Sequence, residues 1–146
     1  MSYTLYNPTT GQILGIMNAS ESVAKIKLRG QSYLPGRWDS NKYYVPQGKI
    51  TLLPEKPSQI PWLQYNFDWA THSWVLDLDA SKKLIRARRN NFMLAVDRVN
   101  PIWYDSLTAE QQQALATYRQ ALLDIPQQAD FPQSVEWPDK PTWLPG

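Results

Sequence analysis

The sequence predicts an α+β fold, and three features of the chain support this class. Residues 1–56 contain short β-rich runs separated by turns, residues 79–125 repeat apolar side chains at helical spacing, and residues 126–146 are rich in proline and tryptophan. A change of apolar period from two residues to between three and four marks the passage from strands to helices. We therefore expect an N-terminal β-hairpin module at 1–56, a connecting β-hairpin at 57–78, a helical hairpin at 79–125 and an extended aromatic strap at 126–146.

The N-terminal module should contain two β-hairpins. Strands at residues 3–6 and 12–16 flank the turn sequence NPTTG, and strands at 42–45 and 49–53 flank Pro-Gln-Gly. Turn residues between short β-rich runs are typical of hairpins. Between the two hairpins, Ser20 is placed to cap a short helix that reaches Leu28, with Val23 and Ile26 facing inward.

A linker punctuated by proline, PEKPSQIP at residues 54–61, leads into the connecting hairpin. Its strands are expected at residues 62–67 and 73–76. In the first of these, Leu63, Tyr65 and Phe67 alternate with polar side chains, which is the period of a strand with one buried face.

Two helices should follow and pack against each other. The first is expected to begin at the capping residue Asp79 and to run to about Val99, with Asn100 and Pro101 ending it. The second should begin at Thr108, since Gln111 stands three residues later in capping-box spacing, and should end at Pro126. The apolar stripes predicted to meet are Ile85, Phe92, Val96 and Val99 on the first helix, and Leu115, Tyr118, Leu122 and Ile125 on the second.

The last segment should be an extended strap. Five prolines, at positions 126, 132, 138, 141 and 145, are expected to hold it near extended or polyproline geometry. Its apolar anchors between the prolines are Ile125, Phe131, Val135, Trp137 and Trp143. Such a segment can lie along a groove of its own helices or reach a neighbouring protein.

Composition gives little support for catalysis. The chain has one histidine, His72, and no cysteine, so a metal site would lack the usual partners. Asp77 and Asp79 lie two residues apart, but helix capping explains Asp79 more simply than acid–base chemistry does. No phosphate-binding glycine loop, nucleophile elbow or metalloprotease spacing occurs. We expect a protein that is not an enzyme and binds no cofactor or metal.

We also expect no association of the chain with a membrane. The first residues lack a basic region followed by an apolar core, and no uninterrupted apolar run is long enough to span a bilayer. These features predict a soluble protein made in a cytoplasm.

The basic cluster in the first helix is the best argument for nucleic-acid binding. Arg86, Arg88 and Arg89 could follow a phosphate backbone, but the formal net charge of the whole chain is only +2. A helix side that contacts protein explains the cluster equally well. We therefore expect no nucleic acid as partner, and we expect these arginines to contact backbone carbonyls or the strap carboxylates Asp130, Glu136 and Asp139.

Aromatic residues make up 12% of the chain and include 7 tryptophans. Tryptophan and tyrosine supply large contact areas and are enriched at protein interfaces. Sugars also stack on flat rings, so a glycan-binding module is an alternative. Because Trp62, Trp69, Trp74, Trp103, Trp137 and Trp143 are dispersed along the sequence, burial within or between subunits is favoured.

The C-terminal third resembles a known family. The string YRQALLDIPQQADFPQSVEWPDKP, from Tyr118 to Pro141, is similar to the C-terminal region of phage tail proteins grouped as tail assembly chaperone-like. The resemblance extends upstream to the basic helix and to the NPIW turn at residues 100–103, and spans roughly residues 65–141. The opening YNPTTGQI and the later YVPQGKI also resemble the N-terminal module of many phage tail proteins.

This resemblance implies a bacteriophage tail protein that acts through protein–protein contacts. Our first hypothesis is a structural or adaptor subunit of the virion tail, baseplate or tail-fibre attachment region, with other tail or fibre proteins or copies of itself as partners. The alternative is a transient tail or tail-fibre assembly chaperone, and a glycan-binding host-recognition module is a more distant one. The protein would be made in the host cytoplasm. The residues expected to interact are Arg86, Arg88, Arg89, Trp103, Tyr118, Arg119, Phe131, Trp137 and Trp143.

Overall fold

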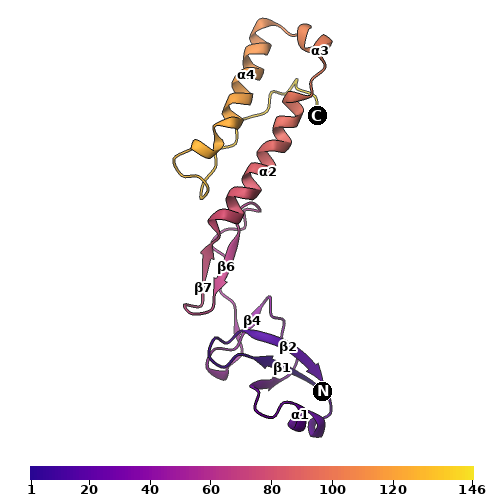
Figure 1. The fold of residues 1–146 in the computed structure, drawn as a ribbon, viewed down its shortest axis with the longest axis vertical. Helices are drawn as coiled ribbons and strands as arrows, with labels where there is room; N and C mark the ends of the chain where they lie inside the picture. The colour runs from indigo at the N-terminus through magenta and orange to yellow at the C-terminus, as the bar shows by residue number, and fades with distance from the viewer. The chain divides into compact units, whose positions relative to one another are not determined.

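The computed structural model describes residues 1–146 and contains both small sheets and helices, which confirms the α+β class (Figure 1). The chain forms two compact units. The first contains Met1–Pro57 and Asn66–Val75, and the second contains Ser58–Tyr65 and Leu76–Gly146.

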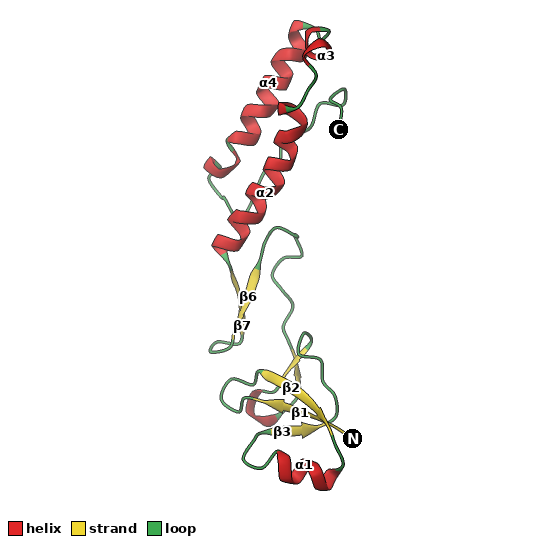
Figure 2. Cartoon of the chain, turned by 45° about the vertical axis from the view of Figure 1, so that its right-hand side comes forward, coloured by secondary structure: helices red, strands yellow, loops and turns green.

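A three-stranded antiparallel sheet organises the first unit (Figure 2). Strands β1 (Ser2–Tyr6) and β2 (Ile13–Asn18) form the first predicted hairpin, and β3 (Tyr33–Pro35), which was not predicted, pairs with the other side of β1. Because β3 has only three residues, it is too short to show a strand period.

The NPTTG turn has a specific physical basis. The side-chain oxygen of Asn7 accepts hydrogen bonds from the backbone N–H groups of Thr9 (2.9 Å) and Thr10 (3.2 Å). Gly11 follows at φ 76°, and a Cβ atom there would lie 2.9 Å from the carbonyl carbon of Val45. Only glycine combines a positive φ with so close an approach of backbone.

Helix α1 (Glu21–Lys27) covers one face of this sheet. Ser20 caps it as predicted, since its hydroxyl oxygen accepts a hydrogen bond from Val23 N. The prediction that Val23 and Ile26 face inward is wrong, because they are 39% and 76% exposed. A helix of two turns buries one narrow face, and here Ala24 and Leu28, four residues apart, occupy it against Tyr3.

The two remaining hairpins are confirmed, but three of their four strands differ in extent from the prediction, and residues 62–64 are not part of a strand. Strands β4 (Tyr43–Tyr44) and β5 (Thr51–Leu52) flank the short 3₁₀ helix η1 (Pro46–Gly48), and β6 (Tyr65–Asp68) pairs with β7 (Ser73–Leu76). In the turn after β6, the Nε2 atom of His72 lies 2.8 Å from the carbonyl oxygen of Thr10, and its ring contacts Tyr44 at 5.0 Å between centroids. His72 therefore has a structural role in the first unit.

Helices α2 (Leu78–Asp97) and α4 (Ala109–Leu123) lie side by side and antiparallel in the second unit (Figures 1 and 2). Asp77 caps α2, since its carboxylate accepts a hydrogen bond from Ala80 N at 2.9 Å. The prediction that Asp79 caps this helix is wrong, because the capping residue lies two positions earlier. Asp79 itself lies in the first turn, where its charge is still favourable at the positive end of the helix dipole.

The segment between these helices contains a helix that was not predicted, α3 (Pro101–Asp105). Asn100 caps it, and Pro101 occupies its first turn, where its missing N–H is no loss. The capping box of α4 is confirmed in both directions, because Gln111 N donates to Thr108 Oγ1 (3.2 Å) and Thr108 N donates to Gln111 Oε1 (2.9 Å).

The two predicted stripes meet in one core, as expected. Its buried members are Ile85, Met93 and Val96 from α2, Leu115, Tyr118 and Leu122 from α4, Ile125 from the 3₁₀ helix η2 (Ile125–Gln127), and Leu144 from the C-terminal segment. Helix α4 ends at Leu123, and Pro126 lies inside η2 instead of terminating α4. The hydroxyl of buried Ser81 accepts a hydrogen bond from Gln64 N (2.9 Å), which ties the segment before β6 to α2.

The first prediction concerns Leu122, which is 0% exposed in this core. Leu122→Ala should lower the free energy of unfolding of the helical unit by about 2–5 kcal/mol, because the substitution removes buried methyl groups and leaves a cavity. Urea unfolding followed by far-ultraviolet circular dichroism measures the change. The control is Leu94→Ala on α2, where the side chain is 44% exposed and the loss should be well below that of Leu122→Ala. Equal losses would contradict the packing.

Candidate functional site

The strap, residues 126–146, lies on the helices of its own chain. Leu144 is 5% exposed and belongs to the same core as Leu122 and Ile125. Four further strap residues pack against this core: Phe131, Val135, Trp137 and Trp143. Of the two placements predicted for the strap, the structure shows the one in which it covers its own helical pair.

The strap is only partly extended, so the predicted polyproline geometry is wrong for its first half and for the turn at residues 142–144. Turns occupy residues 128–134, and residues 135–141 are free of turns and helices. The side-chain amide of Gln128 closes the first half, since it donates to Glu136 O (2.8 Å) and accepts from Glu136 N (2.9 Å). Proline fixes φ alone, and this φ is shared by turns and extended chain, so proline content could not separate the two.

Arg88 is the centre of an aromatic cluster that joins three segments. Its guanidinium carbon lies 4.8 Å from the ring centre of Trp62, 5.3 Å from Phe92 and 5.4 Å from Trp137. Trp137 packs edge-to-face on both Trp62 and Phe92, with centroids 5.6 Å apart in each pair. Because Trp62 precedes β6, Phe92 lies on α2 and Trp137 on the strap, the cluster holds the strap against both other segments.

The strap carboxylates expected as partners do not contact the other two arginines of the basic helix. Arg86 lies over the ring of Phe131 at 5.9 Å, and Arg89 donates two hydrogen bonds to the side chain of Asn90. The salt bridges in the structure are Glu21–Lys25 and Asp97–Arg119, so neither involves the strap acids. A guanidinium is planar and weakly hydrated, and it stacks on aromatic rings as readily as it pairs with carboxylates.

The YRQ sequence places three neighbouring side chains in three environments. Tyr118 is 5% exposed in the core, and burial raises the pKa of its phenol above the ordinary value. Arg119 forms a salt bridge with Asp97 of α2 at 2.8 Å, and this hydrogen bond and charge raise the pKa of Arg119. Gln120 donates to the side chain of Asp124 at 2.9 Å near the end of α4.

All nine residues predicted to interact lie in the second unit, and the structure brings several together. Trp103 of α3 and Trp143 of the strap have ring centres 6.3 Å apart, Arg86 meets Phe131, and Arg88 meets Trp137. These pairs attach the strap to the helices. Sequence reasoning missed Trp62 and Phe92 as ring partners of Arg88. Phe92 stands four residues after Arg88, which is a helix neighbour, but no spacing rule connects Trp62 with either.

The tryptophans of the Arg88 cluster do not form a flat, exposed platform. All 7 tryptophans of the chain are half-buried, and Trp62 and Trp137 meet at an interplanar angle of 74°. The packing within the chain accounts for them without a sugar ligand.

Two of the open grooves on the surface of the second unit lie beside α4. One, of about 490 Å³, lies between α4 and the strap and is lined by Glu110, Gln113, Ala114, Thr117, Tyr118, Ala121, Pro138, Asp139 and Pro141. The other, of about 250 Å³, lies between α2 and α4 and is lined by Arg89, Asn90, Met93, Leu94, Asp97 and Leu123. Grooves with apolar floors and charged rims are suited to peptide segments with one apolar face.

The structure contains no group of three or more histidine, cysteine, aspartate or glutamate side chains that could hold a metal ion. None of its helices combines the length and the apolar character needed to cross a membrane.

Comparison with protein families gives one match. The model of a family described as phage tail assembly chaperone protein matches residues 82–142, a range that contains most of α2, all of α3 and α4, and most of the strap. No curated protein and no solved structure matches the chain. The match shows that this part of the chain is similar to phage tail assembly chaperone proteins, and it supports a role related to the phage tail. The N-terminal resemblance lies outside the matched residues and stays a prediction.

The second prediction concerns the Arg88 cluster. Trp137→Ala should destabilise the helical unit by about 3 kcal/mol, near the lower end of the range for a buried aromatic side chain, since this ring is half-buried. Arg88→Ala should cost less, about 1 kcal/mol. If the two side chains interact, the double variant should lose about 0.5–1 kcal/mol less than the two single losses added together. Additive losses would show that the guanidinium and the ring are not coupled.

The third prediction uses the raised pKa of Tyr118. The folded protein holds this phenol proton more tightly than the unfolded chain does, so the stabilisation is complete below the ordinary pKa of 10.0 and is lost as pH rises through the folded pKa. Tyr118→Phe should therefore leave stability near neutral pH within about 1 kcal/mol of the wild type. Above pH 10 the variant should lose stability less steeply. Denaturant unfolding at several pH values measures the stability of both proteins. If the wild type and the variant lost stability equally steeply above pH 10, the prediction would be contradicted.

Proposed function

We propose that this protein is a phage tail assembly chaperone, which binds another tail or tail-fibre protein during assembly and leaves before the particle is complete. One observation supports this most directly. The residues matched by the chaperone family, 82–142, fall within the second unit, where α2, α4 and the strap share one core. The match favours this role over a structural subunit retained in the virion.

The partner is proposed to bind in the groove between α4 and the strap. Its floor contains the small side chains Ala114, Thr117 and Ala121, which allow a partner segment to approach the helix closely. Glu110 and Asp139 at its rim form no salt bridge within the chain and favour a segment that also carries basic residues. We propose that the partner presents an amphipathic segment with one apolar and one basic face.

A preformed groove suits a transient partner. The strap is already docked on the helices through Leu144, Trp137 and Trp143, so binding does not have to order it. A groove of this size buries a limited area, and small interfaces are typical of weak, reversible association. Release after assembly then needs no large conformational change.

The fourth prediction tests the proposed chaperone role, and a separate experiment tests the groove. A phage that lacks this gene should be complemented by the wild-type chain, and purified virions should contain the chain at far below one copy per structural subunit. Quantitative mass spectrometry of virions measures this amount. Stoichiometric incorporation would support the structural-subunit hypothesis instead.

The groove is tested in the same complementation assay with two matched variants. Ala114→Trp should fill the groove and lower the yield of infectious particles at least tenfold, whereas Ala116→Trp places the same ring on an exposed position of α4 that does not line the groove. Circular dichroism of both purified variants checks that the helices remain folded. Equal yields from the two variants would show that the partner binds elsewhere.

A further inference from the structure

The groove between α4 and the strap contains a polar group whose ring belongs to the core. Tyr118 lines this groove, although the residue is only 5% exposed. Its hydroxyl forms no hydrogen bond within the chain. Trp137 Nε1 is the one enclosed side-chain nitrogen or oxygen that lacks a hydrogen-bond partner, so the Tyr118 oxygen is not enclosed and reaches the surface.

The geometry of a helix indicates where this oxygen lies. A tyrosine on a helix leans over the turn that precedes it in the sequence. On α4 this turn contains Ala114, one helical turn before Tyr118, and Ala114 lines the same groove. The small side chain of Ala114 leaves the hydroxyl accessible, and the buried ring holds it in place.

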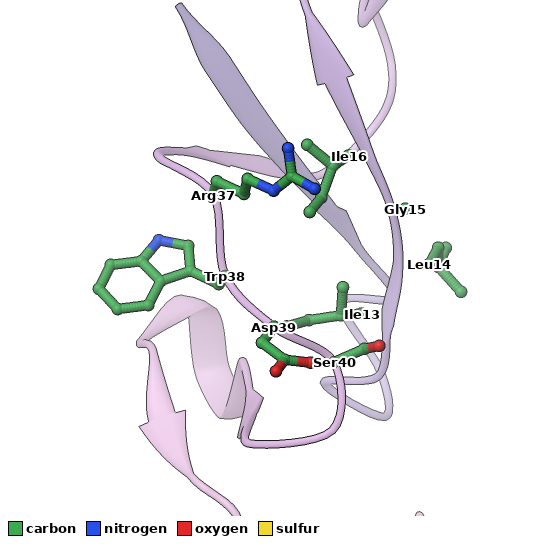
Figure 3. Close-up of a pocket in the computed structure, with 8 residues that line it drawn as sticks. All are labelled: Ile13, Leu14, Gly15, Ile16, Arg37, Trp38, Asp39 and Ser40. Carbon is green, nitrogen blue, oxygen red and sulfur yellow. The ribbon is translucent and has the colours of Figure 1, made fainter.

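A hollow of the same volume in the first unit lacks such a group (Figure 3). It measures about 490 Å³ and is lined by β2 and the loop 37–40. Its charged side chains, Arg37 and Asp39, are exposed, and the indole N–H of Trp38 already donates to Pro35 O (3.3 Å). The groove of the second unit therefore has the better defined polar group for a ligand.

Two carboxylates stand at the rim of the groove in the second unit. Glu110 comes from the first turn of α4 and Asp139 from the strap, and both are exposed. Neither side chain forms a hydrogen bond or salt bridge within the chain. Together with the Tyr118 oxygen they give the groove three acceptor groups, two of which are charged. Such a set is suited to a cation that has several N–H donors.

The rest of the groove is suited to an apolar stem. Helix α4 supplies Ala114 and Ala121, and the strap supplies the rings of Pro138 and Pro141. None of these side chains carries a charge or a hydrogen-bonding group. Lysine and arginine bury their methylene stems on surfaces of this kind while their charged heads stay at polar groups. A basic side chain therefore matches both parts of the groove.

We propose that this groove binds one arginine side chain of the partner protein. Its guanidinium donates to the carboxylates of Glu110 and Asp139 and to the hydroxyl oxygen of Tyr118, whose O–H donates to a backbone carbonyl of the partner. Arginine fits better than lysine, because its five N–H donors lie in one plane and reach acceptors on different sides. The inference rests on the proposed function only in taking the arginine from a tail or tail-fibre protein.

A capped pentapeptide with arginine at its centre and alanine elsewhere is the probe. Titration into the isotope-labelled full chain, followed by nuclear magnetic resonance, should shift the amide signals of Ala114, Thr117 and Ala121. We expect saturation at roughly millimolar peptide, because one side chain supplies few contacts. The same peptide with citrulline, which keeps the size and loses the charge, should bind at least tenfold more weakly. The lysine peptide should bind at least threefold more weakly.

Variants of the groove test its three acceptor groups. Glu110→Gln and Asp139→Asn together should weaken binding of the arginine peptide at least tenfold, since both charges are lost. Tyr118→Phe removes one oxygen and should weaken binding about twofold to tenfold. Asp130→Asn is the matched control, because Asp130 is an exposed strap acid without a salt bridge that does not line this groove, and it should leave binding unchanged. Thermal unfolding checks that each variant is folded.

The proposal would be overturned if the arginine peptide did not bind, or if the citrulline or lysine peptide bound equally well. Binding that Tyr118→Phe leaves unchanged, or that Asp130→Asn weakens as much as the groove variants do, would also overturn it. The assay contains no other phage protein, so its result is separate from the test of the chaperone role. If the arginine peptide binds and virions contain the chain in stoichiometric amount, the site stands and the chaperone role falls. If the peptide does not bind and virions lack the chain, the role stands and the site falls.

Discussion

The second unit depends on one packing arrangement, the burial of Ile85, Leu122 and Ile125 where α2, α4 and the start of the strap meet. All three side chains are 0% exposed. None of the three elements can bury its apolar face without the others, because a single amphipathic helix in water gains most of its stability from tertiary contacts. The Arg88 cluster, the Trp103–Trp143 contact and the two open grooves all lie around this core and take their geometry from it.

The elements that were predicted correctly from sequence are those with local causes. Thr108 and Gln111 satisfy each other's backbone groups within one turn, and the stripes on α2 and α4 repeat at a spacing that only a helix places on one face. The elements that were missed lack such a signal. Strand β3 has three residues and forms because β1 offers it a free side, whereas Pro101 can either end one helix or begin the next.

The site was less predictable than the fold, for a related reason. The sequence identified Arg86 and Arg88 as interacting residues, but it could not tell which partners they meet. Three carboxylates in the strap made salt bridges the simpler hypothesis. The structure shows instead that the rings of Phe131 and Trp137 occupy the positions over these guanidinium groups. The charge pattern of the sequence indicates that these arginines need partners. The path of the strap decides which residues become those partners, and this path depends on packing far along the chain.

The docked strap also limits how a partner protein can bind. Displacing it would expose Leu144 and the rings of Phe131, Trp137 and Trp143. Each fully buried apolar side chain contributes about 1.5–3 kcal/mol, so even with the rings half-exposed the loss would be on the order of 5 kcal/mol. Such a loss would weaken the affinity of a partner by more than about a thousandfold. A partner that leaves the strap in place, and uses the groove beside it, avoids this loss. The energetics therefore favour an open groove as the binding surface, with the strap as one of its fixed walls.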